Sequence, residues 1–138
     1  MRVSEPLTKS SEMRAARYWL SGMLLSLTAA LILSGIVGLP LLITWLIAIN
    51  VFSLLYYGID KLNAVWADEI EARVARKVRI PETSLLLLAL GGGSLGAGLA
   101  MGILNHKLAK SWFITGYLLI LGIQMLAVIL LWDRLPWS

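Results

Sequence analysis

Four apolar runs dominate the chain, and short polar segments separate them. The runs cover about residues 18–37, 41–58, 83–104 and 112–132. An α-helix rises about 1.5 Å per residue, so about twenty residues cross the ~30 Å hydrocarbon core of a bilayer. The pattern therefore predicts an all-α integral membrane protein, a bundle of about four transmembrane helices.

The segments around the first two runs predict a simple organisation. Residues 1–17 are polar, contain Ser, Thr and Pro, and are expected to form a loosely ordered cytoplasmic tail. The stretch SGIVGLP at 34–40 carries no charge and predicts a short turn, with Pro40 near the first turn of the next helix. The first run is longer than a signal-peptide core and no small-residue cleavage site follows it, so we expect it to be retained. Residues 18–138 are then a single transmembrane domain.

The longest internal polar segment, 62–78, has the pattern of an amphipathic helix. Its apolar residues recur at every fourth position: Leu62, Trp66, Ile70, Val74 and Val78. Acidic and basic residues cover the other face, and Glu69 precedes Arg73 in the favourable i, i+4 order. We expect a cytoplasmic helical segment that either continues from the second run or lies along the membrane surface.

Composition narrows the function classes. The chain is 59% hydrophobic and 14% charged, with a mean hydropathy of +0.81, which does not fit an ordinary soluble domain. It has no cysteine and one histidine, so disulfides, thiolate sites and multi-histidine metal sites within one chain are excluded. No metal or cofactor is expected. The net charge of +4 is interpreted as orienting helices against an anionic leaflet, and no nucleic-acid role is expected.

The distribution of Lys and Arg predicts the orientation of the helices. If all four runs cross and the N-terminus is cytoplasmic, ten Lys and Arg residues lie inside and two, Lys107 and Lys110, lie outside. In a rival topology, 83–104 enters the membrane and returns, which places eleven inside and only Arg134 outside. Length favours a crossing, because a re-entrant hairpin needs fewer apolar residues and its backbone must be buried by protein. We expect the crossing, with the re-entrant topology as the alternative.

Six of the twelve glycines lie in the third run. On a helix, at about 100° per residue, Gly91, Gly98 and Gly102 share one face, while Gly92 and Gly96 share a second. Small residues let helix backbones approach closely, so the pattern predicts a central helix packed on two sides. The alternative is a break at the three consecutive glycines, whose freed backbone groups bind an ion or an anionic head group.

Polar residues in and after the second run are candidates for a site. Asn50 lies near the middle of the membrane, where a polar side chain needs a partner, and Gln124 or Asn50 of a second copy could supply it. Asn50, Tyr57 and Lys61 follow one another at i, i+7 and i+11, which is one stripe of a helix.

A charged cluster is expected at the cytoplasmic face, formed by Asp60, Lys61, Arg79 and Glu82. Glu82 follows Pro81, and an acid at a helix start interacts favourably with the helix dipole. The cluster either fixes the loop to the bundle or forms an interfacial site that binds an anionic lipid head group or relays an ion.

His106 and Lys107 end the third run, where the helix dipole favours cations. In the crossing topology they lie a full bilayer away from Glu82. In the re-entrant topology they would join Asp60, Arg79 and Glu82 in one polar site.

Two sequence blocks, YGIDKLNA and RIPE, followed by a glycine-rich stretch and the pair HK, resemble a known family. It is the small bacterial membrane-protein family called domain of unknown function 1294. The matching residues are Asn50, Phe52, Tyr57, Asp60, Lys61, Ala64, Arg79, Ile80, Pro81, Glu82, Gly92, Gly93, Gly96, Met101, His106, Lys107 and Phe113. The resemblance covers about 45–132 and implies a multi-pass bacterial inner-membrane protein, but no activity.

Three functional hypotheses follow, none of them a defined reaction. The first is a small homo-oligomeric transporter or channel for an ion or small solute, in which Asn50, Asp60, Glu82 and His106 face a shared cavity or a dimer interface. The second is a membrane assembly module that binds another protein through its glycine faces. The third is an enzyme acting on a lipid head group, with Asp60, Glu82 or His106 as general base. A non-enzymatic role is favoured; the expected partners are the lipid bilayer, further copies of the chain and an anionic lipid head group as candidate ligand.

Overall fold

The computed structural model describes residues 9–67, 80–104 and 110–135, and every regular element in these ranges is a helix. The elements are α1 (Lys9–Val37), α2 (Leu41–Ala67), α4 (Glu82–Leu88), η1 (Ala89–Gly93), α5 (Ser94–Leu104), α6 (Ser111–Leu130) and η2 (Trp132–Arg134). Four helical segments, counting Glu82–Leu104 as one, are long and apolar enough to cross a membrane. This confirms the all-helical class and the four apolar helices predicted from the sequence.

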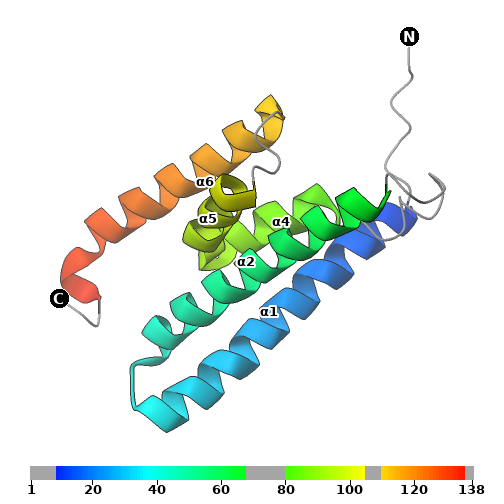
Figure 1. Cartoon of the computed structure of the whole chain (residues 1–138). Coiled ribbons are helices and arrows are strands. Elements are labelled where there is room, and N and C mark those ends of the chain that lie inside the picture. The colour runs from blue at the N-terminus through cyan, green and yellow to red at the C-terminus, as the bar shows by residue number, and fades with distance from the viewer. Residues whose placement is uncertain (1–8, 68–79, 105–109, 136–138) are drawn as a thin grey trace.

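α1 and α2 form an antiparallel pair joined by a short turn (Figure 1). Gly38 follows the last residue of α1 with a positive φ of 74°, and its N–H donates to the Ser34 carbonyl at 2.9 Å. Glycine adopts this left-handed conformation at low cost, which explains its position after the last turn of a helix. The Pro40 carbonyl accepts a hydrogen bond of 3.2 Å from Thr44, so Pro40 lies at the start of α2, as predicted.

Both helices of this pair extend beyond their predicted bounds. α1 begins at Lys9, so the prediction of a loosely ordered tail is wrong for residues 9–17. That stretch is rich in good helix formers, and the Ala15 carbonyl accepts a hydrogen bond of 2.7 Å from Ser84 Oγ of α4. α2 continues to Ala67, so the first residues of the predicted amphipathic segment extend α2. Residues 68–78 and 1–8 lie outside the described residues.

The third apolar run, expected to be one helix over 83–104, consists of two helices joined at a kink. α4 ends at Leu88, a five-residue π-helical turn follows, and α5 starts at Ser94. Within this turn Gly92 has a φ of 117° and a ψ of −2°, outside the helical region and in a conformation that side chains oppose. The prediction of an uninterrupted helix is therefore wrong. The physical reason is that consecutive glycines carry no Cβ to resist the kink.

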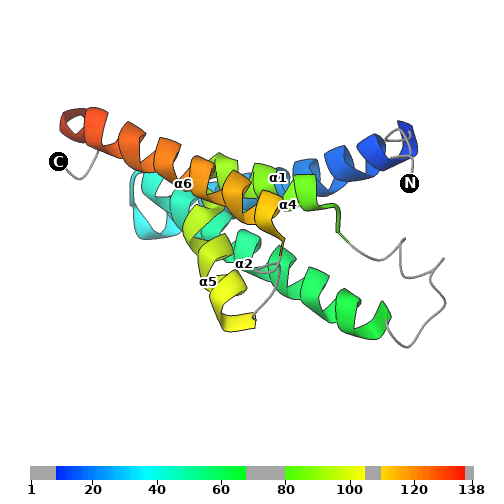
Figure 2. The ribbon, with the colours of Figure 1, turned by 90° about the horizontal axis from the view of Figure 1, so that it is seen from above.

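The kink turns the chain back, so that α6 starts beside the start of α4. Lys110, immediately before α6, forms an ion pair with Glu82, the first residue of α4. One turn further, the ring of Phe113 packs edge-on against that of Tyr57 in α2, with centroids 6.1 Å apart. Figures 1 and 2 show α6 running from this end of the molecule toward the end that holds the α1–α2 turn. The segment 82–104 therefore does not carry the chain from one end of the α1–α2 pair to the other.

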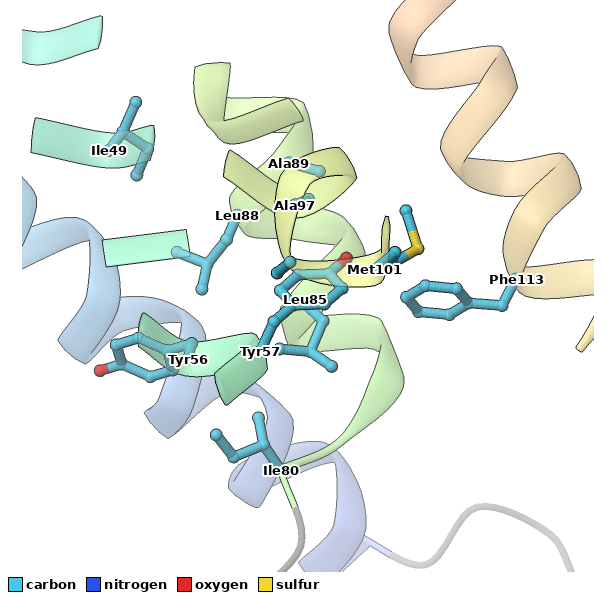
Figure 3. Packing of buried hydrophobic residues seen from close by; sticks show 11 residues of the cluster. Ile49, Tyr56, Tyr57, Ile80, Leu85, Leu88, Ala89, Ala97, Met101 and Phe113 are labelled. Atoms are coloured by element: carbon cyan, nitrogen blue, oxygen red, sulfur yellow. The ribbon is translucent and has the colours of Figure 1, made fainter. Parts of the chain in front are cut away.

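The buried core lies where the broken segment packs against α2 and the start of α6. Its members are Ile49, Tyr56, Tyr57, Ile80, Leu85, Leu88, Ala89, Ala97, Ala100, Met101 and Phe113. Figure 3 shows Leu85 of α4 and Met101 of α5 both beside the Tyr57 ring. In the most apolar 18-residue stretch of the broken segment 44% of the residues are buried, whereas in the corresponding stretch of α6 only 6% are buried. The broken segment is therefore the centre of the fold and α6 its margin.

Candidate functional site

The first half of the break is bound by α6, mainly through one glutamine. Gln124 Nε2 donates to the carbonyl oxygens of Ala89 and Leu90 at 2.7 and 3.0 Å, and Gln124 Oε1 accepts a hydrogen bond from Ser94 Oγ. Tyr117, two turns earlier on α6, donates its hydroxyl proton to the Ser94 carbonyl at 2.9 Å. These bonds attach α6 to both sides of the π-helical turn.

The second half of the break is bound by α2, through Trp45 and Asn50. Trp45 Nε1 donates to the Gly91 carbonyl at 3.0 Å. Asn50 Nδ2 donates to the Gly92 carbonyl at 3.0 Å, while Asn50 Oδ1 accepts from the Gly96 N–H at 2.7 Å. Asn50 was expected to pair with the glutamine of the fourth run or with its own copy; instead both amide side chains bind the backbone of the break.

Side chains of the two neighbouring helices therefore bind all the carbonyls of residues 89–92. Each of these four carbonyls accepts at least one side-chain N–H from α2 or α6. In an apolar surrounding an unpaired backbone group is costly, so these donors are what permit a break at this depth. The same bonds weaken the hypothesis that the break binds an ion through free carbonyls.

Close contacts surround several of the predicted packing glycines. An added Cβ would overlap the backbone carbonyl of Asn50 at Gly96, a methionine of α1 at Gly91 and a tyrosine of α6 at Gly98. The neighbours at these positions come from three different helices, because the broken segment lies among them. Gly102 differs: no described atom lies within 4 Å of a Cβ placed there, so packing among the described residues does not account for this glycine.

A second polar group lies at the end of the molecule where α4 begins. Asp60 is fully buried in the packed end of α2, and its Oδ1 accepts a hydrogen bond of 3.1 Å from the N–H of Ile80. Glu82 forms an ion pair with Lys110, and as the first acid of α4 it also interacts favourably with the helix dipole. The crossing topology had placed Lys110 on the far side of the membrane, which is why sequence reasoning omitted it.

The predicted site residues are divided between these two places. Asn50 lies at the break, ten residues or about 15 Å along α2 from Asp60. Tyr57, Lys61 and Glu82 belong to the second place, near Asp60. Tyr57 and Lys61 lie on the same end of α2 as Asp60, and Glu82 starts α4. Outside the described residues are Arg79, His106 and Lys107. No group of three or more potential metal ligands occurs in the described ranges.

Sequence reasoning missed the groups that bind the break. Trp45 and Tyr117 were not among the site residues predicted from the sequence. The available signal was the presence of N–H and O–H donors inside otherwise apolar runs, next to a run that contains three consecutive glycines. Such donors need acceptors, and a broken helix supplies them.

By length and composition four helical segments could cross a membrane, and the central one is broken and bound by side-chain donors of its neighbours. Residues 50–113 match the family model described as Protein of unknown function (DUF1294), so the chain carries this domain and the resemblance seen in the sequence is confirmed. The matched range begins at Asn50 and ends at Phe113, and it includes the whole broken segment. Neither the curated proteins nor the solved structures gave a match.

Proposed function

We infer that the protein is an integral membrane protein whose segment 82–104 enters the bilayer and returns to the same side. The ion pair between Glu82 and Lys110 supports this, because the two residues flank the segment. Re-entrant backbone must be buried by protein, and this segment is the most buried of the four apolar helices. In this arrangement α1, α2 and α6 cross the bilayer, so the start of α1 and the end of α6 face opposite sides.

The distribution of positive charge supports the same topology. Eleven of the twelve Lys and Arg residues then belong to segments on one side, and only Arg134 belongs to the other. The positive-inside rule makes the first side cytoplasmic, in agreement with the N-terminal orientation predicted from the sequence.

We propose that the protein is a small transporter or channel for an ion or small solute. The observation that carries this proposal is the broken segment at the centre of the fold, bound by neutral side-chain donors of two other helices. Discontinuous helices at membrane depth are typical of transporters, where they place backbone and polar groups near the midplane. Hydrogen bonds between neutral groups can be exchanged at modest cost, so such a segment can shift between two positions.

A homo-oligomer is part of this proposal. Large apolar side chains on α6 are more than half exposed, including Leu119, Ile123 and Ile129. Such a surface fits either lipid or a second copy of the chain. One short bundle encloses little volume, so a solute path is better formed between copies.

The other two hypotheses have less support. Binding of a partner through glycine faces is weakened because Gly91, Gly96 and Gly98 already contact side chains or backbone of their own chain. The enzyme hypothesis named Asp60, Glu82 or His106 as general base. Asp60 accepts the Ile80 N–H and Glu82 pairs with Lys110, while His106 lies outside the described residues.

The test is ion flux with the purified full-length chain in proteoliposomes. Proton, Na⁺ and K⁺ flux are measured with vesicle-entrapped indicators under an imposed gradient. We expect flux above that of protein-free vesicles, and a fall toward the protein-free level in Asp60→Asn and Glu82→Gln, since both remove a charge at the bundle end. Asp133→Asn is the matched control, because Asp133 is an exposed acid in η2, beyond the other end of α6.

Two results would contradict the proposal. One is flux of all three ions equal to that of protein-free vesicles. The other is flux that neither the Asp60 nor the Glu82 variant changes relative to the Asp133 control.

A further inference from the structure

Two buried hydroxyl groups have no hydrogen-bond partner among the residues that the structure describes. Ser53 and Tyr57 are both fully buried, and in the part of the chain that the structure describes neither Ser53 Oγ nor the Tyr57 hydroxyl makes a hydrogen bond. Buried polar groups are nearly always bonded, so each exception needs a physical explanation such as a bound water or ion.

Comparable hydroxyls nearby are all satisfied. Ser26 Oγ donates to the Gly22 carbonyl one turn earlier at 2.7 Å, the usual bond of a helical serine. The Tyr56 hydroxyl, next to Tyr57 in sequence, shares a hydrogen bond of 2.7 Å with Ser21 Oγ. The two unpaired hydroxyls therefore share one face of α2, while the third unpaired buried atom of the described residues, Trp19 Nε1, belongs to α1.

That face is a polar line between the two sites described above. Asn50, Ser53, Tyr57 and Asp60 lie within about 80° of one another on α2, at about 100° per residue. The line starts at buried Asp60, where the Ile80 N–H binds, and ends at Asn50, which binds the break. The Tyr57 ring extends between Leu85 and Met101, so this face of α2 is covered by the broken segment (Figure 3).

Polarity on this path ends at the break. On the same face of α2, the residues that come before Asn50 toward the α1–α2 turn are Leu46 and Ile43, which are both apolar. The polar line therefore leads from the Asp60 end into the middle of the bundle and not through to the other end.

We propose that Ser53 and Tyr57 line a hydrated site in which water carries protons between Asp60 and the break. A hydroxyl both donates and accepts, so two hydroxyls one helical turn apart can each bond a water that neither backbone nor side chain replaces. The proposal rests on the proposed transport function in one respect: it names the proton as the ion that moves. Because the polar line stops at the break, the proton reaches the break along it. Passage beyond the break then requires the broken segment to move.

Thiol accessibility tests the hydrated site without reference to transport. The chain has no cysteine, so Ser53→Cys introduces a single thiol of nearly the same shape as serine. In proteoliposomes, a small water-soluble methanethiosulfonate reagent should modify Cys at position 53 at least about tenfold faster than Cys at position 26, because modification needs a solvated thiolate. Ser26→Cys is the matched control, since Ser26 is equally buried but internally bonded. Equal rates at the two positions would overturn the proposal.

Removing the hydroxyl of Tyr57 supplies a second readout. If that hydroxyl is merely unpaired, Tyr57→Phe raises Tm, because a buried unsatisfied group has been deleted. If it bonds water in the site, Tyr57→Phe has a Tm equal to or below that of the unmodified chain, and proton flux falls. Tyr56→Phe serves as control and lowers Tm through the lost Ser21 bond, without changing flux per folded protein. A raised Tm for Tyr57→Phe would overturn the proposal.

The two failures are distinguishable. A reactive Cys at position 53 with no flux of any ion supports the hydrated site and contradicts transport. Proton flux combined with an unreactive Cys at position 53 supports transport and contradicts the hydrated site.

Discussion

At the scale of single residues, glycines of similar appearance in the sequence have different environments. At Gly96 the missing side chain lets the backbone of Asn50 approach, and an added Cβ would overlap its carbonyl group. Backbone cannot yield as the end of a flexible side chain can. Gly102 is exposed in the same helix, with no described atom near an added Cβ.

We therefore predict opposite effects of the same substitution at these two positions. Gly96→Ala should destabilise the protein by about 1–3 kcal/mol, because overlap with backbone forces a shift of α5 against α2. Gly102→Ala should be neutral or stabilise by up to ~1 kcal/mol, since alanine favours a helix over glycine. Thermal unfolding in detergent, followed by circular dichroism, measures both. Equal Tm values for the two variants would show that the Gly96 contact has no energetic role.

At the scale of elements, side chains of α2 and α6 bind the backbone of the broken segment at its kink. Asn50 in α2 contributes two bonds to its backbone, and Gln124 in α6 contributes two bonds to carbonyls and accepts one from a serine. The two side chains do not bond each other. They cooperate through the segment that both bind.

This arrangement predicts energetic coupling between residues that make no direct bond. Asn50→Ala and Gln124→Ala should each cost about 1–3 kcal/mol, because each removes side-chain hydrogen bonds to the backbone of the break. The loss of unfolding free energy in the double variant should differ from the sum of the two single losses by at least about 0.5 kcal/mol. Once one of the two side chains no longer binds the broken segment, the bonds of the other stabilise it less. A double-mutant cycle of unfolding free energies measures the difference. Strict additivity would mean that the two halves of the break are held independently.

At the scale of the whole molecule, the ion pair between Lys110 and Glu82 is the contact on which the proposed re-entrant topology depends. Both residues flank the segment 82–104, so their contact places the start of α6 beside the start of α4. A straight crossing helix would separate them by about 30 Å.

Labelling of single cysteines tests the topology directly. In the re-entrant arrangement, an impermeant thiol reagent added outside intact cells should modify Asp133→Cys and leave Ser111→Cys unmodified. Leu39→Cys, in the α1–α2 turn, is the positive control, because both topologies place that turn outside. A four-crossing protein would give the reverse result for the first two positions, with Ser111→Cys labelled and Asp133→Cys protected.

The sequence by itself determined the class of the protein, because four apolar runs of membrane length leave few alternatives to four long helices. It also gave the family resemblance, which the match over residues 50–113 supports, and it named Asn50, Asp60 and Glu82 as candidate site residues. Only the tertiary structure decided that the third run is broken. A run of glycines permits a kink as well as a close helix contact, and the choice depends on donors such as Trp45 and Gln124, distant in sequence, that satisfy the freed carbonyls. The direction of the chain after the break, and with it the pairing of Lys110 with Glu82, follows from that choice.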